Sequence, residues 1–147
     1  MIKMVVSDKI SSALDKLSSK MKDMSPVMSS IGMELEKRAS NRFETETDPN
    51  GKRWAAHKPS TVKRSKGGNG QILNHTGEML RSLNHQSDSN SVMVGFGKPY
   101  AFFHERGTKR MVRRGLLFSD PVAGTLGTGD EQAVLSIAQD YLRKVIP

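Results

Sequence analysis

The stretch from Ser91 to Gly107 most constrains how this chain folds, because it holds the densest group of large apolar side chains. It begins with Val92, Val94 and Phe96 at alternate positions, a pattern typical of a half-buried strand. A second group follows and places three of the eight Phe, Tyr and Trp residues within four positions, at Tyr100, Phe102 and Phe103. Aromatic side chains bury more area than any others, so we expect this cluster to anchor the core.

Two amphipathic helices are predicted in the first third of the chain. Over residues 8–24, with Ser7 or Asp8 as the N-cap, apolar residues recur at helical spacing at Ile10, Leu14, Leu17, Met21 and Met24. Ser25-Pro26 ends this helix and favours a new one over 26–44. The inner face of the second helix is predicted at Met28, Ile31, Leu35, Ala39 and Phe43. A core face of two packed helices is favoured over a Met-rich partner groove.

Residues 45–70 hold a turn, the only Trp and a basic loop. Asp48-Pro49-Asn50-Gly51 has the composition of a tight turn. We expect Trp54 to pin its loop to the core, the alternative being a base-stacking role. The Lys- and Gly-rich loop over 60–70 lacks the spacing of a nucleotide-binding P-loop, and it is expected either to order on a partner or to remain solvated.

A hairpin and a closing helix complete the pattern. Residues 82–87 are predicted to pair with 91–96 as an antiparallel hairpin. The Gly-rich loop 119–129 precedes a last helix, which Asp130 is expected to cap and which runs to about residue 144. This order of elements predicts an α+β fold in one domain over 1–147. Its parts are an N-terminal helical segment, an α+β core with a small antiparallel sheet, and a C-terminal helix, over 1–45, 46–120 and 130–145.

Composition narrows the class of protein. A chain of 147 residues with 35% apolar side chains predicts a modest core, and a ring or dimer partner would help to bury surface. The absence of cysteine excludes disulfides and cysteine-rich zinc sites. No stretch approaches the roughly 18 apolar residues of a membrane span, and Asp8 precedes any long apolar region. We therefore expect no membrane segment and no signal peptide.

The net charge of +8 comes entirely from the middle of the chain. Residues 49–114 carry thirteen basic and three acidic side chains, a net of +10, whereas 1–48 sum to zero and 115–147 to −2. Such a basic excess attracts phosphates or an acidic partner surface.

No catalytic motif is present. The chain lacks the zincin pair of histidines and the Gly-x-Ser-x-Gly elbow. His75 and Glu78 lie three positions apart, and His104 precedes Glu105, so a fold that gathered all four would offer a metal site. Hydrogen-bonded or surface histidines are the more common outcome, and we expect no metal, no cofactor and no catalytic residue.

Several short motifs follow one another between about 43 and 120. They are Asp48-Pro49-Asn50-Gly51 with Trp54, Thr61 before the Lys-rich loop, Leu73 with Thr76-Gly77-x-Met79-Leu80-x-Ser82-Leu83, Val92-x-Val94-Gly95, and Tyr100-Ala101-x-x-His104-x-x-Gly107 with Arg114. In this order they resemble the phage virion morphogenesis proteins, also called tail completion proteins, of Mu-like prophages and related tailed phages. The chain departs from the family pattern after Arg114, where it has Gly115-Leu116-Leu117-Phe118 and then the Gly-rich loop.

The resemblance implies a structural, non-enzymatic protein of the virion. Such a protein completes the tail or neck at the head–tail junction, after assembly in the host cytoplasm, and helps to join tail to head. Sixfold rings are common there, which implies that the partners are other copies of the chain, tail-tube and head-connector proteins, and packaged DNA. We expect partner or DNA contacts from the basic residues Lys52, Arg53, Lys63, Arg64, Lys66, Lys109, Arg110, Arg113 and Arg114. Structural roles are expected for Trp54, Tyr100, His104 and Gly107.

Two other functions remain open at this point. A DNA-binding module acting outside a virion would use the basic residues over 49–114, and salt-dependent DNA affinity of the isolated chain would favour it. A metal-dependent hydrolase would use His75, Glu78, His104 and Glu105, and would require bound metal in the purified protein.

Overall fold

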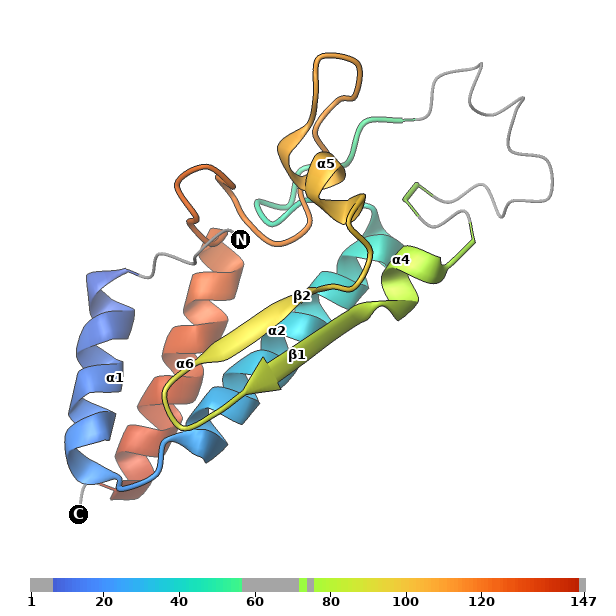
Figure 1. The fold of residues 1–147 in the computed structure, drawn as a ribbon. Coiled ribbons are helices and arrows are strands. Elements are labelled where there is room, and N and C mark those ends of the chain that lie inside the picture. The colour runs from blue at the N-terminus through green and yellow to red at the C-terminus, as the bar shows by residue number, and fades with distance from the viewer. Residues whose placement is uncertain (1–6, 57–71, 74–75, 146–147) are drawn as a thin grey trace.

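The computed structural model describes residues 7–56, 72–73 and 76–145, and it has the predicted α+β fold with helices first, a small antiparallel sheet and a final helix. Figure 1 shows α1, α6 and α2 side by side, with the hairpin β1–β2 lying over α2. The elements are α1 (Asp8–Lys20), α2 (Ser25–Thr45), α4 (Glu78–Arg81), β1 (Leu83–Ser87), β2 (Val92–Phe96), α5 (Ala101–Arg106) and α6 (Thr128–Val145).

Helix α1 forms where the apolar spacing predicts it, although it ends earlier. The Ser7 hydroxyl accepts a hydrogen bond from the backbone N–H of Ile10 at 3.4 Å, which caps the first turn. The helix ends at Lys20, four residues before the predicted end, and an Asp23 carboxylate oxygen 2.9 Å from the backbone nitrogen of Ser25 holds the following turn. Met24 is buried as predicted, but it lies in this turn and not in α1.

Helix α2 is the longest element and packs against α6 and both strands. The five residues predicted on its inner face are all buried. Pro26 occupies the first turn, where backbone N–H groups have no acceptor within the helix, so the N–H that proline lacks costs no hydrogen bond. Glu46 then takes a left-handed conformation and ends the helix.

The predicted antiparallel hairpin is confirmed, with both strands inside their predicted ranges. Leu83 pairs with Phe96 and Ser87 with Val92, antiparallel throughout. It lies so close to α2 that a Cβ at Gly32 would come within 2.7 Å of the His85 ring. Glycine at position 32 therefore sets the separation between helix and sheet.

Two hydrophobic clusters share α2. One joins α1, α2 and α6, and the other gathers Phe43, Trp54, Met79, Ala101 and Leu116. The burial of Trp54, which is 5% exposed and makes an edge-to-face contact with Phe43, confirms that it pins its loop to the core.

The prediction that the aromatic cluster would anchor the core is wrong. Tyr100, Phe102 and Phe103 are 41%, 46% and 50% exposed. In the short helix α5, Ala101 and Glu105 lie four positions apart and are the two buried residues. The helical period therefore turns the aromatic side chains outward.

The expected cap of the last helix is also wrong. Helix α6 begins at Thr128, so Asp130 is the third residue of its first turn and not its N-cap, and its buried side chain pairs with Arg38 and Arg42. The predicted apolar side is otherwise observed, with Val134 and Ala138 buried and Tyr141 partly buried. No helix in the described part of the chain has both the length and the hydropathy of a membrane span.

Candidate assembly interface

The motif residues that lie far apart in the sequence meet at segment 113–118. The indole N–H of Trp54 donates to the carbonyl of Gly115 at 2.9 Å. Arg42, on α2, donates to the carbonyl of Leu116 at 2.8 Å. Arg114 donates to the carbonyl of Ala55 at 2.9 Å. The side chains of Trp54 and Arg42 thus satisfy carbonyls of an irregular segment that has no β-ladder, and Arg114 ties that segment to the loop at Ala55.

Glu105 holds this segment from α5. Its two carboxylate oxygens accept hydrogen bonds from the backbone N–H groups of Leu116 (2.8 Å), Leu117 (2.7 Å) and Phe118 (3.0 Å). The residue is only 4% exposed. We call this set of contacts the Glu105 clamp; it fixes α5 to the core, as a buried carboxylate with several N–H donors can do.

Arg113 closes the Glu105 clamp on its outer side. Its guanidinium donates to the backbone carbonyls of Glu105 and Phe118 at 2.7 and 2.6 Å, and it lies 3.5 Å from the Glu105 carboxylate. Burial raises the pKa of the Glu105 carboxyl, while the three N–H donors and the charge of Arg113 act in the opposite direction.

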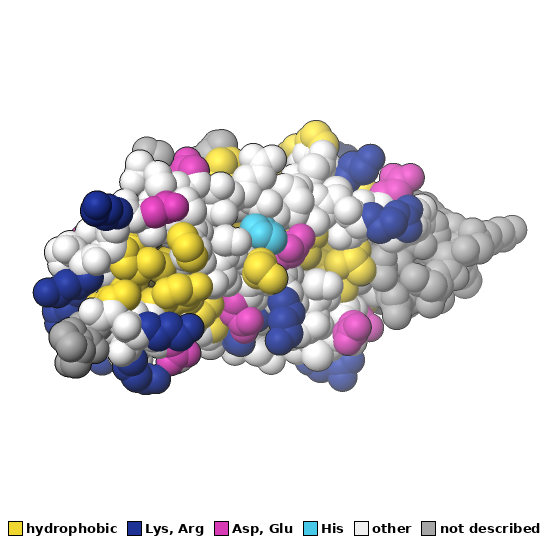
Figure 2. Space-filling model, turned by 90° about the horizontal axis from the view of Figure 1, so that it is seen from below, with side chains coloured by type: hydrophobic (Ala, Val, Ile, Leu, Met, Phe, Trp, Pro, Cys, Tyr) yellow, Lys and Arg dark blue, Asp and Glu magenta, His cyan; other side chains and the backbone are white. Residues whose placement is uncertain are grey.

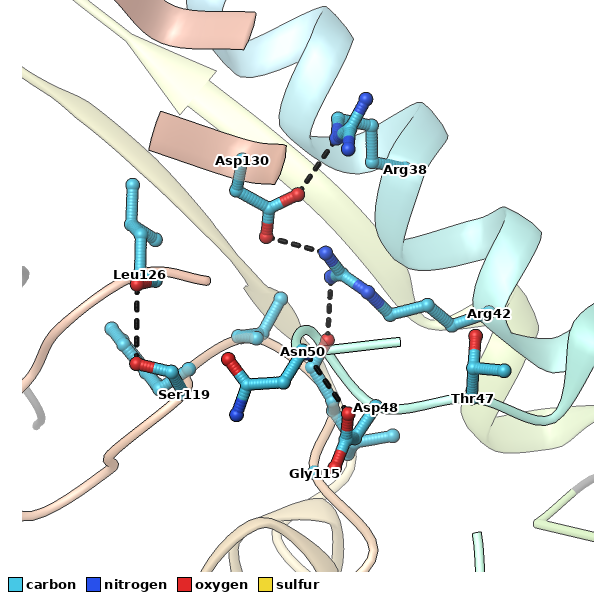
Figure 3. A network of polar contacts seen from close by, with 12 residues as sticks. Arg38, Arg42, Thr47, Asp48, Asn50, Gly115, Ser119, Leu126 and Asp130 are labelled. Carbon is cyan, nitrogen blue, oxygen red and sulfur yellow. Dashed lines mark hydrogen bonds and ion pairs between the residues drawn. The ribbon is translucent and has the colours of Figure 1, made fainter. Parts of the chain in front are cut away.

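The Asp48-Pro49-Asn50-Gly51 turn packs against the same segment. The Asp48 carboxylate accepts from the backbone N–H of Asn50 and of Lys52, each at 2.9 Å, and Gly51 takes the positive φ of 85° that the turn requires. Figure 3 shows Asp48 and Asn50 beside Gly115. A Cβ at Gly127 would lie 2.2 Å from the carbonyl oxygen of Pro49, so the turn and the start of α6 touch through backbone atoms.

A buried ion network ties α6 to α2 next to the clamp. One carboxylate oxygen of Asp130 accepts a hydrogen bond from the Arg38 guanidinium at 2.7 Å, and the other oxygen pairs with Arg42, as Figure 3 shows. The same Arg42 guanidinium also donates to the carbonyl of Leu116, so it links α6, α2 and segment 113–118. The cavity beside this network measures roughly 20 Å³ and has room for about one water molecule, not for a substrate.

His104 lies at the edge of the clamp. Its carbonyl accepts from the N–H of Arg114 at 2.9 Å, and Tyr100 stands edge-on to its ring at 6.4 Å. Among the described residues its Nδ1 is a buried polar atom without a hydrogen-bond partner. Burial, followed by the nearby charge of Arg114, lowers the pKa of this imidazole. The imidazole of His104 is therefore neutral at neutral pH.

Residues 98–112, which include Glu105, form a projection that we call the arm. Figure 1 shows α5 and the loop after it standing away from the three long helices. Gly107, with φ of 73°, turns the chain at the end of α5, and a Cβ there would crowd the backbone of Arg113 at 3.1 Å. The arm exposes the three aromatic side chains of the cluster together with Arg106, Lys109 and Arg110.

The predicted basic residues divide into three groups. Lys52, Arg53, Lys109 and Arg110 are exposed. Arg113 and Arg114 are partly buried and donate to backbone carbonyls within the chain. Lys63, Arg64 and Lys66 lie outside the described residues.

The structure gathers no catalytic constellation among the described residues. No three His, Asp or Glu side chains of that part of the chain lie close enough to share a metal ion. His75, one of the four groups that a hydrolase would need, lies outside the described residues. Both oxygens of Glu105 already accept backbone hydrogen bonds, so the best-placed carboxylate serves the fold.

Sequence reasoning missed the two buried carboxylates, Glu105 and Asp130. Acidic residues are usually solvated, and nothing in spacing alone distinguishes these two. Glu105 did have one signal, because it stands inside the Tyr100-to-Gly107 motif.

Comparisons with known proteins agree with one another. The model of the phage virion morphogenesis family matches residues 5–143. A Haemophilus influenzae protein, "Mu-like prophage FluMu G protein 2", is 28% identical over 137 residues, covering 93% of this chain and 91% of that protein. No solved structure matches.

Proposed function

We propose that this chain, which belongs to the phage virion morphogenesis family, is a structural protein that completes the tail and helps to join it to the head. We further propose that it acts at the head–tail junction as a ring of copies and catalyses no reaction. The observation that carries the proposal is how the exposed arm is held: the motif residues Trp54 and Arg114 fasten segment 113–118, and the Glu105 clamp joins the arm to that segment. Contacts that hold an exposed apolar surface in place are typical of an assembly protein.

The exposed basic residues supply the contacts in this proposal. Lys52, Arg53, Lys109 and Arg110 lie at the surface, where charge steers association and fixes orientation. Lys63, Arg64 and Lys66 are also proposed to contact an acidic protein or the packaged DNA. Arg113 and Arg114 contribute through the arm that they fasten.

The proposal is tested by complementing a phage or prophage that lacks the gene. Purified wild-type protein is added to the lysate, and joined particles are counted by electron microscopy together with infective titre. We expect separate heads and tails without the protein and joined particles with it. Failure of the wild-type protein to restore joining would contradict the proposed function.

A charge-reversal variant tests the basic surface. Changing Lys52, Arg53, Lys109 and Arg110 to Glu is expected to abolish joining while leaving the fold intact. The matched control changes four exposed lysines of the N-terminal region to Glu, namely Lys9, Lys16, Lys20 and Lys22. Normal joining by the first variant would refute the role of the basic surface.

Light scattering at two salt concentrations, with and without purified tails, tests the ring. A closed ring, or a monomer that forms a ring on tails, is the expected result. A persistent monomer that ignores tails but binds duplex DNA in a salt-dependent way would favour a DNA-binding module instead.

A further inference from the structure

We propose that the exposed face of α5 in the arm inserts its phenylalanines into an apolar pocket with an acidic rim on a different virion protein. The inference rests on the proposed function, because it names the chemistry of a partner in the joining step. Phe102 and Phe103 are the proposed anchors, and Arg106, Lys109 and Arg110 are the proposed rim contacts.

The two phenylalanines form a preformed group. Their ring centroids lie 5.9 Å apart at 78°, and the guanidinium of Arg106 lies 5.3 Å from the Phe102 centroid. Each ring is about half exposed although its neighbours already restrict it. Ordering side chains is a main cost of association, so an anchor that is ordered before binding loses less.

Helix α5 is firmly held on the face opposite its exposed phenylalanines. The Glu105 clamp makes three backbone hydrogen bonds from one buried carboxylate, and Arg113 and Arg114 add bonds on either side. The core gains little from Phe102 and Phe103, because their rings face solvent. A rigid mount for exposed aromatic side chains is the arrangement found at the energetic centre of protein interfaces.

The charge around the phenylalanines has one sign. Four cations lie within 98–112, and the single carboxylate there, Glu105, is buried in the clamp. None of the four takes part in an ion pair between described residues. A complementary surface is therefore acidic at its rim and apolar at its centre.

A second copy of the chain fits this description less well. The chain has a net charge of +8. Figure 2, seen from below the view of Figure 1, shows Lys and Arg interleaved with Asp and Glu on that side. Like charges brought together at an interface oppose association.

Nucleic acid also fits less well. Base stacking requires an open aromatic face, and the Arg106 guanidinium covers one face of Phe102. The two rings stand nearly perpendicular to each other, so they do not form a platform for successive bases. An apolar pocket accommodates perpendicular rings without this restriction.

Binding to purified tails and to purified DNA-filled heads, both from phage lacking the gene, tests the inference. Labelled protein is sedimented with each particle at 50 and 500 mM salt. We expect Phe102→Ser with Phe103→Ser to weaken binding to one particle by roughly tenfold or more at both salts. Lys109→Glu with Arg110→Glu should weaken it strongly at low salt and less at high salt. Val122→Ser, at an apolar side chain that is 76% exposed on another loop, is the matched control and should bind normally.

A photo-crosslinker at position 103 identifies the occupant. The expected product joins the arm to a virion protein other than this chain, at a peptide that contains Asp or Glu beside apolar residues. A crosslink to a second copy, a crosslink to DNA, or unchanged binding by the Phe variant would each overturn the inference.

The two proposals fail separately. If the wild-type protein does not restore joining, the proposed function fails, while particle binding and crosslinking still test the arm. If both the wild-type protein and the Phe variant restore joining equally, only the inference about the arm fails. Unfolding of the Phe variant, followed by Trp54 fluorescence, shows whether its fold is intact.

Discussion

A carboxylate oxygen of Glu105 lies 2.8 Å from the backbone nitrogen of Leu116, and both residues are buried. The same side chain reaches the next two backbone nitrogens, so a single acidic residue replaces the ladder that segment 116–118 lacks. Because Glu105 also belongs to α5, this contact fixes the position of the arm relative to the core.

Changing Glu105 to Gln is expected to lower the free energy of unfolding by about 1–3 kcal/mol. The amide keeps one acceptor oxygen but turns an NH₂ group toward backbone N–H donors, which leaves buried donors unsatisfied. Urea unfolding followed by fluorescence of Trp54, the only Trp in the chain, measures the change. Glu44→Gln, at an exposed position of α2, is the matched control; an equal effect there would argue against the clamp.

Changing Asp130 to Asn should be more damaging, by about 3–5 kcal/mol, because it leaves the buried Arg42 guanidinium without its countercharge. The exposed Asp140, which pairs with Arg143 at 2.7 Å, offers a control on the same helix. Asp140→Asn is expected to change stability by less than about 0.5 kcal/mol. Similar urea midpoints for both variants would contradict the structural role of Asp130.

Changing Gly127 to Ala should destabilise the protein by about 1–3 kcal/mol, because the new methyl would overlap the carbonyl of Pro49. Gly95→Ala in β2 adds the same atom where nothing lies within 4 Å. Thermal unfolding of the two variants compares the sites directly. A neutral Gly127→Ala would mean that the turn and α6 do not touch through their backbones.

Acidification should weaken the fold in part through His104. Its folded pKa lies below the ordinary 6.5, so the unfolded state binds more protons just below that pH. The contribution of His104 is thus fully present above pH 6.5 and is lost as pH falls toward the folded pKa. Urea midpoints at pH 7.5 and 5.5 should therefore differ less for His104→Gln than for the wild type.

Glu105 has the opposite effect on the free energy of unfolding as the pH falls. Its folded pKa is raised above 4.5, so protonation on acidification favours the folded state in the window between the two values. Both proteins retain Glu105, and the difference between them isolates His104. An identical pH dependence in wild type and His104→Gln would show that the imidazole is not desolvated.

Repeating patterns in the sequence predicted the regular elements. The spacing of Ile10 and Leu17, and of Ile31 and Leu35, predicted two helices and their buried faces. Alternation at Val92 and Val94 predicted the hairpin. Such patterns work because a helix or a strand exposes one face at a fixed period, which the chain must match locally.

The sequence by itself therefore determined the α+β order of elements, the inner faces of the long helices, the position of Trp54 and the resemblance to the morphogenesis family. Only the tertiary structure decided that Glu105 and Asp130 are buried, that Arg114 donates to the backbone of Ala55, and that Phe102 and Phe103 face solvent. The physical reason is that burial of a charge depends on donors brought from distant segments, as Arg42 and the backbone of 116–118 are here. Exposure of an aromatic ring likewise depends on whether other residues have already filled the core, as Phe43 and Trp54 have done.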